Sequence, residues 1–155
     1  MPKLMSQKCG YGLRILLELT SQQGNGPISV SEIAASQAIP QRFLELIVKE
    51  LREAGMVNSY RGARGGYTLA KDPEKLTVGR IVRLLDGPVN PMDCEPCGGD
   101  RECDMAGKCV FADLWMEAEK VLTDLYDSVT FAELHLRRKG NAKPIGKNVR
   151  AEVLA

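Results

Sequence analysis

Residues 29–70 read SVSEIAASQAIPQRFLELIVKELREAGMVNSYRGARGGYTLA, and this stretch decides the fold. Ser29 and Glu32 have the spacing of a capping box, in which each side chain bonds the backbone amide of the other where a helix begins. The pattern predicts a short helix over 30–36 and a turn over 37–39. A longer helix then begins near Pro40 and stops at Gly55, because proline suits a first helical turn and glycine suits the left-handed residue after a helix.

Two short β-prone runs follow, at 56–60 and 67–70, and they are separated by the basic, glycine-rich segment 61–66 (RGARGG). This arrangement predicts a hairpin with a basic tip. Ahead of the quoted stretch, apolar residues at helical spacing predict a first helix over 6–20. The expected fold class is mainly α with a small β-hairpin, arranged as a winged helix-turn-helix that binds DNA. The alternative is a small α/β domain whose tip arginines are merely solvated.

The composition changes after a further helix that Thr77 can cap and that ends before Gly87. Residues 87–109 contain three prolines, four glycines and four cysteines, with few aliphatic side chains. Such a stretch cannot bury itself as a helix or a strand. We therefore expect something other than side-chain packing to organise this cysteine-rich loop.

A long helix is predicted over 110–136, because apolar residues alternate steps of four and three along it. A helix of this length needs a partner to cover its apolar seam, so we expect a homodimer. The alternative is that the helix packs only on its own winged domain. The seam consists of Phe111, Trp115, Ala118, Leu122, Leu125, Val129, Ala132 and Leu136.

The predicted organisation is a winged-helix DNA-binding domain (1–86), the cysteine-rich loop (87–109), a dimerisation helix (110–136) and a basic tail (137–155) expected to be disordered. The charge is distributed accordingly. Residues 1–85 carry 12 Lys/Arg against 7 Asp/Glu, whereas residues 86–135 carry 3 against 12. The first part can therefore face phosphates and the middle cannot. With no apolar run of membrane length, we expect a cytoplasmic protein that does not enter a membrane.

The loop cysteines form the strongest chemical signal. Four soft ligands within sixteen residues are typical of metal or cluster binding, and a disulfide framework is not expected in a reducing compartment. Only one pair has the CxxC spacing of structural zinc sites, so we favour an iron-sulfur cluster over zinc, with a reversible disulfide as a third alternative. The candidate ligands are Cys94, Cys97, Cys103 and Cys109.

Together, the segment 37–67 with its RGARGG tip, three cysteines spaced alike and the long helix resemble the IscR family of bacterial iron-sulfur regulators. The resemblance covers about residues 1–136. It implies a dimeric regulator that senses iron or redox state through a cluster, 2Fe-2S being favoured and 4Fe-4S remaining open, and that controls cluster-assembly genes. It assigns cluster ligation to Cys97, Cys103 and Cys109.

The fourth ligand differs from the family pattern. The IscR type has a histidine three residues after the last cysteine, and this chain has Ala112 there. Cys94 is the leading replacement, because it is a thiolate in the same loop. Cys9 is the second candidate, and the harder oxygen donors Asp93 and Glu95 rank third.

The resemblance also implies DNA contacts at Arg42, Phe43, Glu45 and Arg61. A core position is the alternative for Phe43. The chemistry of the polar residues agrees with base reading: Arg42 can bind guanine, Gln41 can bind adenine and Glu45 can accept from a cytosine amino group. Arg61 or Arg64 can enter a narrow minor groove.

We therefore predict a regulator that binds a roughly palindromic double-stranded operator. An enzyme is disfavoured, because the chain has one histidine and no nucleotide-binding glycine loop. The rival is a zinc-stapled or thiol-disulfide-switched regulator or adaptor.

Overall fold

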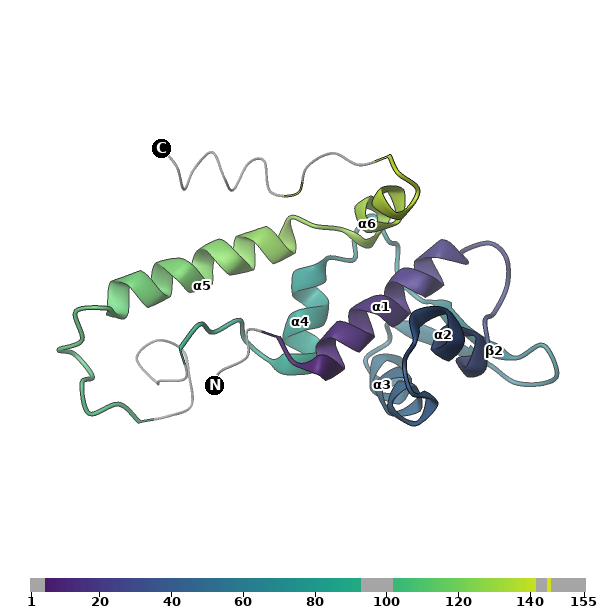
Figure 1. The fold of residues 1–155 in the computed structure, drawn as a ribbon, viewed down its shortest axis with the longest axis horizontal. Helices are drawn as coiled ribbons and strands as arrows, with labels where there is room; N and C mark the ends of the chain where they lie inside the picture. The colour runs from purple at the N-terminus through teal and green to yellow at the C-terminus, as the bar shows by residue number, and fades with distance from the viewer. Residues whose placement is uncertain (1–4, 93–101, 142–144, 146–155) are drawn as a thin grey trace.

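The computed structural model describes residues 5–92, 102–141 and 145, and the elements follow the predicted order for a winged helix (Figure 1). The fold is mainly helical with one antiparallel hairpin, as expected. The elements are α1 (Gln7–Ser21), α2 (Val30–Gln37), α3 (Gln41–Glu53), β1 (Val57–Tyr60), β2 (Gly66–Leu69), α4 (Val78–Asp86), α5 (Ala112–Asp127) and α6 (Phe131–Arg138).

Most of the predicted helix ends are confirmed. Both hydrogen bonds of the Ser29–Glu32 capping box are present at α2, and the bonds from Ser29 lower the pKa of Glu32. Thr77 caps α4 by accepting a bond from the backbone amide of its third residue. After α3, Gly55 has a φ of 70°, the left-handed conformation that glycine adopts without steric cost.

The hairpin is tied to the rest of the domain by a third short segment. β1 and β2 pair in antiparallel register from Val57 opposite Leu69 to Tyr60 opposite Gly66. Just ahead of α2, Ile28 forms a bridge to the residue after Gly66, with backbone hydrogen bonds of 2.9 and 3.1 Å. An added Cβ at Gly66 would lie 2.4 Å from the carbonyl oxygen of Ile28, so the close approach requires glycine.

The core surrounds α1, which packs against α3, α4 and α6. Gly12 allows the close approach of α1 and α4, since a Cβ there would lie 2.3 Å from the Leu85 side chain. The largest fully buried side chains come from every helix except α5 and from the segment ahead of α4, and they are Phe131, Ile15, Leu16, Leu19, Ile33, Leu44, Leu51, Leu76, Ile81, Val48, Val82 and Cys9.

The prediction of one continuous helix over 110–136 is wrong. The chain leaves the helical conformation between α5 and α6, where Thr130 forms an isolated antiparallel bridge with Thr77. The Val78 amide donates to the Val129 carbonyl at 2.9 Å. Pairing with the segment ahead of α4 thus replaces the helical bonds that the apolar spacing predicted.

The new helix after this break belongs to the winged domain. Thr130 and Glu133 form a second capping box at the start of α6. Phe131 is fully buried, and its amide donates to the Leu76 carbonyl at 3.0 Å. Among the last residues of the predicted seam, Val129 is buried in its own domain, as the alternative prediction expected, whereas Leu136 is 49% exposed.

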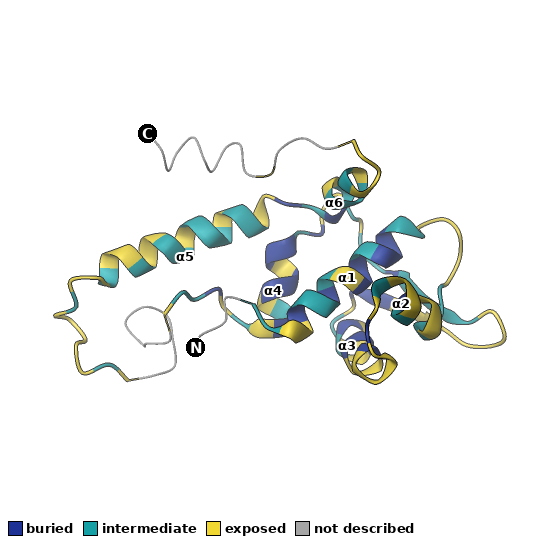
Figure 2. Cartoon of the chain, in the orientation of Figure 1, coloured by how far each residue is buried: buried dark blue, intermediate teal, exposed yellow. Residues whose placement is uncertain are grey.

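α5 differs from the other helices in its surroundings. Its C-terminal part packs against α4, with Leu122 and Tyr126 partly buried on the core. Its other end extends away from the domain, and every residue of the helix is partly or fully exposed (Figure 2). Apolar side chains lie uncovered near this end, namely Phe111, Leu114 and Met116.

Candidate DNA interface and cysteine loop

α3 is amphipathic, and the predicted base-reading residues lie on its outer face. Gln41, Arg42 and Glu45 are exposed, while the opposite face of the helix is buried in the core. The Gln41 amide donates to the Glu45 carboxylate at 2.9 Å, one helical turn away. Three polar groups with different donor and acceptor patterns are thus presented together at the start of the helix.

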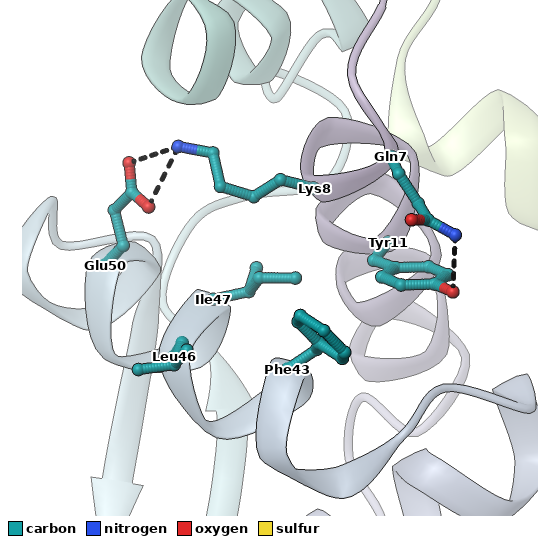
Figure 3. A pocket seen from close by; sticks show the side chains of 7 residues that line it. All are labelled: Gln7, Lys8, Tyr11, Phe43, Leu46, Ile47 and Glu50. Carbon is teal, nitrogen blue, oxygen red and sulfur yellow. Dashed lines mark hydrogen bonds and ion pairs between the residues drawn. The ribbon is translucent and has the colours of Figure 1, made fainter.

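Phe43 is 56% exposed, so its reading as a core residue is wrong. It lines a shallow apolar groove of about 270 Å³ between α1 and α3, in which Tyr11 and Ile47 also lie (Figure 3). Lys8 spans the groove to Glu50, with both nitrogen–oxygen distances at 3.2 Å. The groove is therefore bounded by α3 and is crossed by an ion pair.

The wing carries both predicted arginines at its tip. Arg61 and Arg64 are exposed and lie in the turn that joins β1 to β2. This turn depends on its glycines: Gly62 has a φ of 105°, and the Gly65 amide donates to the Gly62 carbonyl at 2.9 Å. The structure thus places two guanidinium groups on a tight, defined tip.

Two of the four predicted cluster ligands lie in the described part of the chain. Cys103 and Cys109 are partly exposed free thiols, and Cys109 lies three residues before the first residue of α5. The Cys103 carbonyl accepts from Ala106 at 3.0 Å, in a turn between the two cysteines. The other candidates lie outside the described residues, and they are Cys94, Cys97, Asp93 and Glu95.

Cys9, the second candidate for the fourth ligand, is unsuited to that role. It is fully buried in the domain core. Burial first, and then the charge of Asp86, raise the pKa of its thiol to about 12. A thiol in this setting behaves as a small apolar side chain and not as a thiolate. Within the described residues, no three His, Cys, Asp or Glu side chains converge on a common point.

The single histidine is also remote from the cysteine loop. His135 lies on α6, and its Nδ1 is 3.0 Å from the Ser21 hydroxyl on α1. Burial and the charges of Lys139 and Arg138 lower the pKa of His135. Ala112, at the family's histidine position, is the first residue of α5.

One buried acidic residue, Glu18, was not predicted from the sequence. Glu18 accepts hydrogen bonds from Gln37 at 2.6 Å and from Arg138 at 2.7 Å, and its side chain is only 5% exposed. A signal was available, because Glu18 lies between Leu16 and Leu19 on a helix whose inner face is apolar. A charge beside such a face is seldom buried without a partner.

The similarity of this chain to known proteins identifies its family. Residues 5–136 match the model of the Rrf2 family, described as an iron-dependent transcriptional regulator. The chain belongs to the Rrf2 family. It is 36% identical to the transcriptional regulator CymR of Bacillus subtilis over 130 residues, 84% of this chain and 88% of that protein. It is 31% identical to IscR of Klebsiella pneumoniae over 130 residues, 84% of this chain and 78% of that one.

Solved structures of Rrf2 relatives agree with the fold. The structure of B. subtilis CymR, described as the global cysteine regulator, superposes with a TM-score of 0.72 at 35% identity, covering 88% of this chain and 98% of that one. An oxidized form of Staphylococcus aureus CymR gives a TM-score of 0.69 at 31% identity, covering 84% of this chain and 94% of that one. These relatives are winged-helix regulators. In the described part of this chain, no helix has the length and apolar character needed to cross a membrane.

Proposed function

We propose that this Rrf2-family protein is a cytoplasmic homodimer that binds a roughly palindromic DNA operator and holds an iron-sulfur cluster on its cysteine loop. The observation that carries the DNA-binding part is the pairing of an exposed polar helix face with a basic wing. α3 presents Gln41, Arg42 and Glu45, and the wing presents Arg61 and Arg64. A helix in the major groove with a basic wing beside it is how winged helices read a duplex.

Two substitutions separate base reading from phosphate attraction. Arg61→Ala is expected to weaken binding to all duplexes and to lower the salt slope by about one unit, as for loss of one phosphate contact. Glu45→Ala is expected to relax preference at one position by about 1–3 kcal/mol, because a carboxylate rejects bases that offer no amino donor. Titration of a set of operator variants at several salt concentrations measures both. If Glu45→Ala and the wild type rank all duplexes in the same order of affinity, Glu45 does not read a base.

The homodimer is supported by the free end of α5. Phe111, which immediately precedes α5, and Leu114, three residues further on, are each 56% exposed at the end of the helix that extends away from the domain. Large apolar side chains gathered on a projecting helix are typical of an interface. A second copy would cover them by the same surface, as two-fold symmetry requires, and would set two reading heads at a fixed spacing.

Leu114→Glu is expected to convert the dimer to a 17.0 kDa monomer and to weaken operator binding strongly. An unpaired charge buried in the interface costs about 3–5 kcal/mol. Size exclusion with light scattering measures the mass. Lys120→Gln changes the net charge by the same amount at an exposed position of α5 and should stay dimeric. A dimer in both variants would argue against this face. Leu122 is a poorer probe, because it also packs on the core.

The cluster is supported by the chemistry of the donors. Cys103 and Cys109 are free, partly exposed thiols. Thiolates are the usual ligands of iron-sulfur clusters, so these residues fit the group, with Cys94 and Cys97 completing the set. When bound, a cluster supplies a redox-active centre whose stability depends on its ligands. Purification without air followed by iron, sulfide and zinc analysis tests the assignment. A red-brown protein with iron and sulfide supports it, and a colourless protein with stoichiometric zinc contradicts it.

A thiol-disulfide switch is the second candidate function. It is favoured by the relative whose structure is described as the oxidized form of CymR. The same partly exposed thiols could form a reversible disulfide, since exposed cysteines react more readily than buried ones. Thiol counts before and after mild oxidation of the metal-free protein distinguish the two. Loss of two thiols with a change in DNA affinity supports the switch.

A further inference from the structure

One carboxylate joins three helices of the domain. Glu18 of α1 accepts from Gln37 at the end of α2 and from Arg138 at the end of α6, both through Oε2. Arg138 also donates to the Ser21 hydroxyl, and this hydroxyl is 3.0 Å from His135. Figure 1 shows α6 beside the C-terminal half of α1, on which these contacts converge.

The residue after Gln37 is in an unfavourable conformation. Ala38, in the turn between α2 and α3, has φ 49° and ψ 47° and is the single non-glycine residue with positive φ in the described chain. A side chain with a Cβ is strained there by about 1–2 kcal/mol. The turn therefore needs contacts that hold it, and the Gln37–Glu18 bond lies immediately beside it.

Because Glu18 is charged and buried, its position beside this turn depends on Arg138 of α6. The Glu18 side chain is 5% exposed, whereas Arg138 is 45% exposed and reaches in from the surface. A buried carboxylate that loses its cation moves toward water. This movement alters the acceptor that Gln37 uses. The Arg138 guanidinium thus keeps Glu18 at the place where it holds the turn.

We propose that Glu18 is a positioning residue for DNA binding: paired with Arg138 of α6, it anchors Gln37 and so fixes the turn that aims α3. The effect on DNA rests on the proposed function, whereas the effect on the turn does not. Docking of α6 then controls the geometry of a turn that α6 itself does not form. Since α6 continues from α5, this contact links the far end of the chain to the recognition helix.

Hydrogen exchange tests the anchor without DNA. The Ile39 amide, which donates to the Ala34 carbonyl at 3.0 Å, reports on the turn. Arg138→Met is expected to speed its exchange about tenfold by freeing the turn locally. Glu18→Gln added to Arg138→Met should restore near wild-type exchange, because a neutral amide stays in place without a cation and still accepts from Gln37. A merely structural role for Arg138 predicts no such rescue.

Lys139→Met is the matched control, since it removes the same charge from the adjacent residue, which has no bond to Glu18. The Ile39 amide of Lys139→Met should exchange at the wild-type rate. Affinity for a duplex selected by the wild type from a random library should fall about tenfold in Arg138→Met and recover in the double variant. Equal turn exchange in Arg138→Met and Lys139→Met would overturn the proposal.

A failure of Arg138→Met to fold and a failure of the wild type to bind DNA lead to different conclusions. If Arg138→Met does not fold, Arg138→Gln, which also removes the charge, is measured in the same way, and an exchange rate equal to wild type at Ile39 together with unchanged affinity would overturn the proposal. If the wild type selects no duplex, the proposed function fails, while the exchange comparison still decides the role of Glu18.

Discussion

Phe131→Ala is expected to lower the free energy of unfolding by about 3–5 kcal/mol, the usual cost of emptying a fully buried phenylalanine site. Phe131 is 0% exposed and is the largest side chain of the core. A domain of this size is stable by about 5–15 kcal/mol, so the loss is a large fraction of the total. Urea unfolding followed by circular dichroism, at one fixed protomer concentration, measures the change.

Phe43→Ala is the matched control for this measurement. The same atoms are removed, but Phe43 is 56% exposed, so the expected loss is below about 1 kcal/mol. If Phe131→Ala were no more destabilising than Phe43→Ala, α6 would not be part of the domain core. Exchange of the α1 amides should also rise in Phe131→Ala, because α1 packs against α6.

The second large effect concerns the cysteine loop. Cys103→Ala and Cys109→Ala are each expected to abolish iron and sulfide incorporation, because both belong to the three cysteines that match the ligands of the IscR family. Cys97→Ala should do the same, whereas Cys94→Ala should give a cluster that is lost faster in air. Iron and sulfide analysis with absorbance spectra, on protein prepared without air, measures each variant.

Cys9→Ala is the control, since this buried thiol belongs to the core and its pKa is raised to about 12. It should retain wild-type iron and sulfide. Wild-type cluster stability in Cys94→Ala together with cluster loss in Cys9→Ala would reverse the assignment. Ala112→His added to Cys94→Ala should recover a cluster with a higher reduction potential, because imidazole replaces a thiolate.

Local patterns predicted the winged domain well. The Ser29–Glu32 box, the Thr77 cap and Gly55 each depend on bonds within a few residues, and all three were placed correctly. Such features can be predicted because neighbours along the chain determine them. Arg42 and Glu45, which the resemblance singled out, are both exposed.

The long-range contacts could not be derived in the same way. The break before α6 depends on pairing between Thr77 and Thr130, which are far apart in sequence. A local signal was present, since Thr130 and Glu133 have capping-box spacing, but the heptad spacing across it was given more weight. The Glu18–Arg138 pair likewise joins residues 120 positions apart. The spatial arrangement of the four loop cysteines stays a prediction.

The bridge between Thr77 and Thr130 fixes the place where the chain returns to the domain after the cysteine-rich loop. The chain leaves the domain at the C-terminal end of α4 and returns beside its N-terminal end. The segment between α4 and the Thr77–Thr130 bridge therefore begins and ends at opposite ends of α4. These ends are about 13 Å apart, since α4 has nine residues and a helix rises 1.5 Å per residue. Closing a flexible loop between fixed ends costs only about 0.6 kcal/mol more for each doubling of its length. Insertions, deletions and new cysteine spacings between α4 and α5 are thus expected to change the free energy of folding little, whereas changes in the C-terminal part of α5, which packs against α4, are not.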